Sequence, residues 1–108
     1  MNRIASTFQT LAAAKKKALV GYLTAGDPNQ ETSFEILRAA CGAGIDVLEL
    51  GVPFSDPMAD GPVIQEASQR ALKAGMTLTK TLDFAARLRR ESDIPIMLFG
   101  YYNPLFKY

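Results

Sequence analysis

The sequence predicts an α/β fold with parallel strands, and two observations carry that prediction. Three short apolar runs, at 18–24, 47–51 and 95–100, are typical of strands buried on both faces. Segments with helical spacing of apolar residues separate them, so the expected order is α-β-α-β-α-α-β. Strands that alternate with helices pair in parallel. Two architectures then remain open, a doubly wound open sheet and a (βα)₈ barrel.

The N-terminal helix follows from apolar spacing. Ile4, Phe8 and Leu11 form the apolar stripe of a short helix over 4–14. The lysines at 15–17 then have two interpretations. They contact a phosphate or nucleic acid, or, as is more usual, they form a solvated helix end that the helix dipole favours.

The next helix is bounded by glycine. Phe34, Leu37 and Cys41 lie on one face of it, and Gly42 and Gly44 are expected to end it. Cys41 is expected to be a small buried hydrophobic side chain rather than a reactive thiol.

Two consecutive helices are predicted after the second strand. The loop 52–61 is rich in residues that break regular structure, a helix over 62–74 ends at Gly75, and another helix begins near Thr77. The sequence shows no internal repeat, linker or second domain. Residues 1–108 are therefore expected to be part of a single domain.

Composition excludes several classes of function. The net charge is +1, from 12 basic and 11 acidic residues, which gives no electrostatic reason to expect nucleic acid or an acidic membrane surface as a partner. No window approaches the roughly 18 apolar residues of a membrane span, so a soluble, cytoplasmic protein is expected. One cysteine and no histidine argue against a zinc site. They leave proton transfer to Asp, Glu, Lys or Tyr.

Glu49 is the most informative single residue. It is the only charged residue in the second apolar strand, and its neighbours Leu48 and Leu50 are expected to face the other side of the sheet. Loss of water there disfavours the charged form of a carboxylate, which suits a general acid or base. The C-terminal end of a parallel strand is also where such folds keep their chemistry. The alternative is a buried structural glutamate paired with a lysine or arginine.

Asp60 and Asp56 are further candidates, each with an ordinary alternative. Asp60 follows Glu49 in the next loop and is a candidate second carboxylate facing it, but Asp-Gly-Pro ahead of a helix is also typical of an N-cap. Asp56, between Ser55 and Pro57, is more typical of a turn. Three carboxylates in one neighbourhood also raise the alternative of a magnesium site, although their spacing matches no recognised metal-binding loop.

Two tyrosines at strand ends are candidates for contact with an aromatic substrate. Tyr22 lies near the end of the first strand, and Tyr101 follows the third. Each is also typical of a core or a pocket rim.

Three segments together resemble the tryptophan synthase alpha chain family. Residues 21–28, GYLTAGDP, are similar to its first strand and loop, and residues 96–105 are similar to its third strand and loop. Residues 49–62, ELGVPFSDPMADGP, resemble its signature segment, which is highly specific because few families share so long a run. The resemblance covers essentially the whole chain.

The resemblance implies a (βα)₈ TIM barrel, of which this truncated chain supplies an N-terminal helix and the first three βα units. It implies a lyase of tryptophan biosynthesis that cleaves indole-3-glycerol phosphate to indole and glyceraldehyde 3-phosphate. The family's catalytic glutamate falls on Glu49, which would move protons at the substrate, including C3 of the indole. Its catalytic aspartate falls on Asp60, which would hold the indole N–H. A barrel typically needs about 250 residues, so the chain alone is expected to be inactive.

The resemblance also implies a partner. The family binds a beta chain in an α₂β₂ complex, and its contact loops fall here on Pro53, Asp56, Pro57 and Asn103. Pyridoxal phosphate belongs to the beta chain, so no cofactor is expected for this chain.

Two other functions remain open. A barrel enzyme that forms a Schiff base with a sugar phosphate would need a lysine at a strand end, and no lysine lies beside any of the three strand ends. A non-catalytic module that only docks on a beta chain would keep its biological activity when Glu49 is replaced by glutamine.

Overall fold

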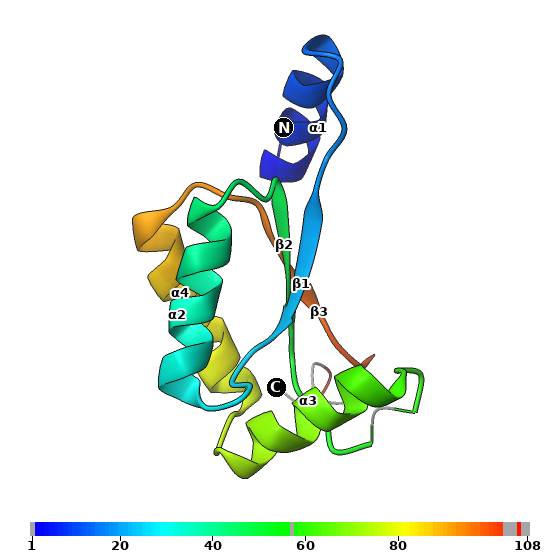
Figure 1. Cartoon of the computed structure of the whole chain (residues 1–108), viewed down its shortest axis with the longest axis vertical. Coiled ribbons are helices and arrows are strands. Elements are labelled where there is room, and N and C mark those ends of the chain that lie inside the picture. Colours follow the sequence, from blue (N-terminus) through cyan, green and yellow to red (C-terminus); the bar gives the residue numbers. More distant parts are fainter. Residues whose placement is uncertain (1, 57, 103–105, 107–108) are drawn as a thin grey trace.

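The computed structural model describes residues 2–56, 58–102 and 106, and its elements follow the predicted order (Figure 1). The elements are α1 (Arg3–Ala13), β1 (Val20–Thr24), α2 (Gln30–Gly42), β2 (Val47–Gly51), α3 (Pro62–Lys73), α4 (Leu78–Glu91) and β3 (Ile96–Phe99). Within this described part, no helix has the length and apolar character needed to cross a membrane.

The strands form a parallel sheet in the order β1-β2-β3. Tyr22 pairs with Glu49, and Glu49 pairs with Met97. Because side chains alternate between the two faces of a strand, these three residues form one row on one face of the sheet. The even-numbered residues of β2 point the other way.

Helices α2 and α4 cover the face opposite Glu49 (Figure 1). Leu48 and Leu50 are fully buried there, and the rings of Phe34 and Phe84 meet edge to face at a centroid distance of 5.5 Å. The same core contains further apolar side chains of the two helices, namely Leu37 and Leu88. The predicted apolar stripe of the second helix is therefore confirmed, and it places the hydrophobic core on one side of the sheet.

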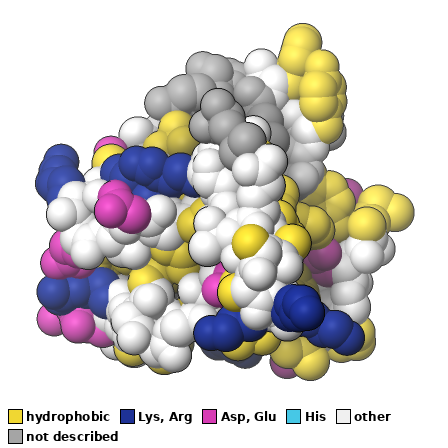
Figure 2. Space-filling view, turned by 90° about the horizontal axis from the view of Figure 1, so that it is seen from above, with side chains coloured by type: hydrophobic (Ala, Val, Ile, Leu, Met, Phe, Trp, Pro, Cys, Tyr) yellow, Lys and Arg dark blue, Asp and Glu magenta, His cyan; other side chains and the backbone are white. Residues whose placement is uncertain are grey.

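The other face of the sheet carries apolar side chains that remain open to solvent. Val20 is 44% exposed, Met97 39% and Phe99 48%. Figure 2, a view from above, shows hydrophobic side chains prominent on the side away from α2 and α4, with charged side chains on the side of these helices and along the lower edge of the view. Glu49 belongs to this open face.

Local hydrogen bonds explain where the elements begin. Asn29 caps α2 by accepting from the Thr32 N–H at 2.9 Å. Strand β1 begins at Val20, two residues later than predicted, because the Leu19 N–H donates to the Asp46 carboxylate at 2.7 Å rather than to a neighbouring strand. Helix α1 ends before the lysines at 15–17, which are exposed, as a solvated helix end requires.

Cys41 packs against the core from the end of α2 and is partly buried. Burial raises the pKa of its thiol, and the positive charge of Arg89 acts in the opposite direction. The predicted packing against the core is confirmed, although Cys41 is partly rather than fully buried; its low reactivity stays a prediction.

Candidate active site

Glu49 lies in the middle of β2, half-buried, on the face that α2 and α4 leave open. Leu48 and Leu50 on either side of it face the core, as predicted. The ion pairs between described residues do not involve Glu49. The alternative of a structural glutamate paired with a basic side chain therefore gains no support from the described part of the chain.

Asp60 does not cap the helix that follows it. The N-cap of α3 is Gly61, which has no side chain to accept a cap hydrogen bond, and Pro62 begins the helix. The backbone carbonyl of Asp60 accepts from the Gln65 side chain at 2.7 Å. The N-cap interpretation of Asp60 is thus wrong, because the cap position falls one residue later, and capping does not account for the carboxylate.

Tyr22 shows that the two carboxylates share one neighbourhood. Burial raises the pKa of Tyr22, a hydrogen bond from the Thr24 hydroxyl at 3.3 Å opposes this rise, and the negative charges of Asp60 and Glu49 add to it. Both carboxylates therefore lie close enough to act on the phenol. Tyr22 and Glu49 are paired in the middle of β1 and β2 rather than at the predicted strand ends, and Asp60 lies near enough for its charge to act on the Tyr22 phenol.

Gly51 makes room for the Tyr22 ring. A Cβ atom at position 51 would lie only 2.6 Å from Cζ of Tyr22, and the ring also meets Phe99 edge-on at 5.6 Å. This role of Gly51 was not predicted. A glycine inside a strand is a known signal of close approach, but the sequence does not name what approaches.

Tyr101 fastens the loop that carries Asp60. Its hydroxyl accepts from the Ala59 N–H at 2.8 Å, and its ring stacks on Phe54 at 5.0 Å with an interplanar angle of 26°. Tyr101 was predicted as a substrate contact, and this second role was not foreseen. The loop between β2 and α3 is thus tied to the segment after β3.

The predicted partner contacts fall into three groups. Asp56 is exposed, and its carbonyl accepts from the Met58 N–H at 2.9 Å, which agrees with the turn interpretation. Pro53 is buried, whereas Pro57 and Asn103 lie outside the described residues. Within the described ranges no three acidic, cysteine or histidine side chains gather as metal ligands, so the magnesium interpretation gains no support.

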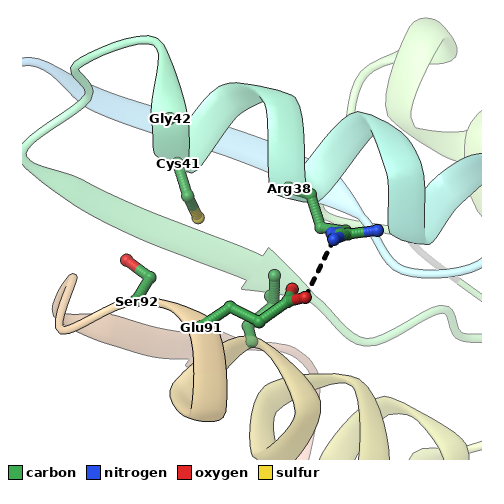
Figure 3. Close-up of a pocket in the computed structure, with 6 residues that line it drawn as sticks. Arg38, Cys41, Gly42, Glu91 and Ser92 are labelled. Atoms are coloured by element: carbon green, nitrogen blue, oxygen red, sulfur yellow. Dashed lines mark hydrogen bonds and ion pairs between the residues drawn. The ribbon is translucent and has the colours of Figure 1, made fainter.

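Two cavities lie at different places in the fold. One of about 170 Å³ lies between the end of β1 and α3 and is lined in part by Tyr22, Thr24 and Ile64. A larger one of about 370 Å³ lies between α2 and α4, beside the Arg38–Glu91 ion pair (Figure 3). The larger cavity is on the helix side of the sheet, away from Glu49. The smaller cavity shares Tyr22 with the neighbourhood of the two carboxylates.

Comparison of the sequence with known proteins points to a single family. The family model described as "Tryptophan synthase alpha chain" matches residues 8–108. The tryptophan synthase alpha chains of Desulfosudis oleivorans and Desulfatibacillum aliphaticivorans are 64% and 57% identical over the whole chain, which spans 41% of each relative.

Comparison with solved structures points to the same family. The tryptophan synthase alpha subunit of Legionella pneumophila matches with a TM-score of 0.96 and 45% identity, over 100% of this chain and 42% of that one. An aminoacrylate-bound tryptophan synthase of M. tuberculosis matches with a TM-score of 0.94 and 32% identity, over 100% of this chain and 44% of that one. The open choice between a doubly wound sheet and a barrel is thereby settled, since the three βα units form the N-terminal portion of a TIM barrel. The chain belongs to the tryptophan synthase alpha chain family.

Proposed function

We propose that these residues are the N-terminal part of a lyase that cleaves indole-3-glycerol phosphate to indole and glyceraldehyde 3-phosphate in tryptophan biosynthesis. The observation that carries this proposal is the position of Glu49, half-buried beside Tyr22 on the open face of the sheet. Asp60 supports it, because its carboxylate acts on the same phenol and is not used as a helix cap.

The proposed reaction is a retro-aldol cleavage driven by proton transfer. A proton added at C3 of the indole makes the ring an electrophilic indolenine with positive charge at nitrogen. The bond from C3 to the glycerol carbon then breaks, its electrons return to the ring, and the adjacent hydroxyl loses its proton to become the aldehyde. Such steps need positioned acids and bases and a fixed negative charge opposite the developing positive one. They need no cofactor.

Each carboxylate has one role in this scheme. Glu49 moves the protons, because it lies half-buried next to Tyr22 on the face of the sheet that the substrate would occupy. Asp60 accepts the indole N–H and stabilises the positive charge on nitrogen. Tyr22, which lines the adjoining cavity, provides aromatic surface for the indole ring, and Tyr101 is a further proposed contact from the segment that holds the Asp60 loop.

The proposed partner is a tryptophan synthase beta chain in an α₂β₂ complex, which would hold the pyridoxal phosphate, in the cytoplasm. The loop between β2 and α3 supports a docking role. Asp56 is exposed there, and Met58 is 81% exposed. Pro53 is buried and would shape the loop rather than face the partner. Pro57 and Asn103 remain proposed contacts.

The test uses a completed chain, in which residues 1–108 are joined to the C-terminal part of the Desulfosudis oleivorans relative that follows the matched region. Glu49→Gln and Asp60→Asn keep the size of each side chain and remove its acid–base function. Each is expected to lower the rate of indole release by roughly 10²–10⁴-fold, the usual cost of losing a general acid or base. Asp83→Asn, an exposed position on α4, is the matched control and should leave the rate unchanged. Near-normal rates for both active-site variants would refute the proposal and favour a non-catalytic docking module.

A further inference from the structure

Helix α3 carries Asp60 at its N-terminal end. Gly61 makes no side-chain cap, and Gln65 joins this segment to the helix twice: its side chain donates to the Asp60 carbonyl at 2.7 Å, and its N–H donates to the Gly61 carbonyl at 3.0 Å. The Gln65 side-chain bond holds the Asp60 backbone, and the ion pairs between described residues do not involve the Asp60 carboxylate. The position of Asp60 therefore depends on where α3 lies.

The C-terminal half of α3 is tied to the loop between β1 and α2. Nε of Arg70 donates to Oδ1 of Asp27 at 2.7 Å, and Nη2 donates to Oδ2 at 3.1 Å. Such a two-bond pair fixes direction as well as distance, because both groups are planar. One turn further on, the Gln30 side chain donates to the Ala74 carbonyl at 2.9 Å. Two links thus join the segment that runs from Asp27 to the start of α2 to the C-terminal end of α3.

The loop that presents Asp27 is itself held firmly. Gly26 has a positive φ of 92°, and its N–H donates to the buried Ser33 hydroxyl at 2.8 Å. Met76, which is 2% exposed, lies so close over Gly26 that a Cβ atom there would meet its side chain at 2.6 Å. The Asp27 carboxylate is therefore a fixed point relative to β1.

We infer that the Asp27–Arg70 pair positions Asp60 for the reaction by fixing the orientation of α3 over the ends of β1 and β2. Partly exposed ion pairs add little to stability, and Arg70 is 51% exposed against 21% for Asp27. The main contribution of the Asp27–Arg70 pair is therefore to hold α3 in one orientation rather than to stabilise the fold. Displacement of a catalytic group by about 1 Å can lower the reaction rate on the order of 10²-fold. A small rotation of α3 that moved Asp60 would therefore be enough to slow the reaction. This inference rests on the role proposed for Asp60.

The test compares Arg70→Met and Arg70→Lys in the completed chain, with Lys73→Met, an exposed position on the same helix, as the matched control. Arg70→Met is expected to lower kcat by roughly 10–100-fold with KM changed less than about threefold, because a misplaced catalytic group acts on the transition state. Arg70→Lys keeps the positive charge but cannot make the two parallel hydrogen bonds to Asp27. Its kcat should therefore lie between that of the parent and that of Arg70→Met. Lys73→Met should match the parent in rate, and the melting temperatures of all variants should stay within about 4 °C of the parent.

A double-mutant cycle with Asp60→Asn separates positioning from general loosening. If Arg70 acts through Asp60, adding Arg70→Met to Asp60→Asn should slow indole release by less than about twofold more, because interacting sites are not additive. A full additional loss in that background, or an unchanged kcat for Arg70→Met alone, overturns the inference. Failure of the proposed function itself looks different, since Asp60→Asn alone would then retain the parent rate.

Discussion

Replacing Gly51 by alanine should force the Tyr22 ring out of its place beside Glu49. The added Cβ would lie 2.6 Å from Cζ and 3.0 Å from Cε2 of the ring, whereas carbon atoms pack best at about 3.5–4.0 Å. The ring must therefore recede by about 1 Å. That movement disturbs the edge contact with Phe99 and the hydrogen bond from Thr24.

The cost follows from those two contacts. An edge-to-face aromatic pair contributes about 0.5–1.5 kcal/mol beyond its buried area, and a hydrogen bond of this kind contributes about 1 kcal/mol. Gly51→Ala should therefore lower the free energy of unfolding by about 1.5–2.5 kcal/mol, within the usual range for an overpacked core. Urea titration of the completed chain, followed by circular dichroism, measures this difference.

A second substitution tests the cause. Tyr22→Val removes the ring, so Gly51→Ala in that background should cost less than about 0.5 kcal/mol, because the contact that made the sites interact is gone. Tyr22→Phe removes the hydroxyl, which is the atom nearest to the added Cβ, and leaves the contacts at Cζ and Cε2, so part of the cost should persist there. An equal cost in the parent and in Tyr22→Val would refute the reasoning and point to the backbone of β2 instead.

Three further outcomes follow from the structure. The pKa of Tyr22 is raised above 10.0 in the folded state, so above that pH the unfolded chain releases this proton first. The stability present below pH 10 should then fall as pH rises, and less steeply in Tyr22→Phe on alkaline urea titration. Cys41, partly buried with a raised thiol pKa, should react slowly with a thiol reagent at pH 8 and rapidly once unfolded. A polypeptide of residues 1–108 alone should self-associate through the open face that carries Val20, Met97 and Phe99, and sedimentation that shows a stable monomer would contradict this.

The sequence was sufficient for the order of elements and for the face on which Glu49 lies. Both depend on patterns within a few residues, such as the alternation of Leu48, Glu49 and Leu50. The parallel pairing followed because helices separate the strands, and the structure confirms it. These features are local, and they would be the same in any fold that buries the same apolar faces of these helices and strands.

Contacts between distant positions could not be predicted in the same way. Arg70 and Asp27 lie 43 positions apart, and Tyr101 and Ala59 lie 42 apart. Neither pair can be recognised from a periodic pattern in the sequence, because the two residues of each pair come into contact only through the way whole helices, strands and loops are placed relative to one another. The N-cap error at Asp60 has a related origin. Asp60 and Gly61 are both possible N-cap positions ahead of Pro62. The structure uses Gly61, and the Gln65 side chain then donates to the Asp60 carbonyl.

The pairing of Glu49 with Tyr22 and Met97 also restricts how this gene segment can evolve. Strand side chains alternate with a period of two, so the loss or gain of a single residue within β2 would turn Glu49 into the helix layer and push Leu48 or Leu50 outward. Such a change removes the candidate acid–base group and part of the core in one step. Length changes should therefore be found among relatives in the loops and not inside this strand, even where nearly every other residue of the strand has been exchanged.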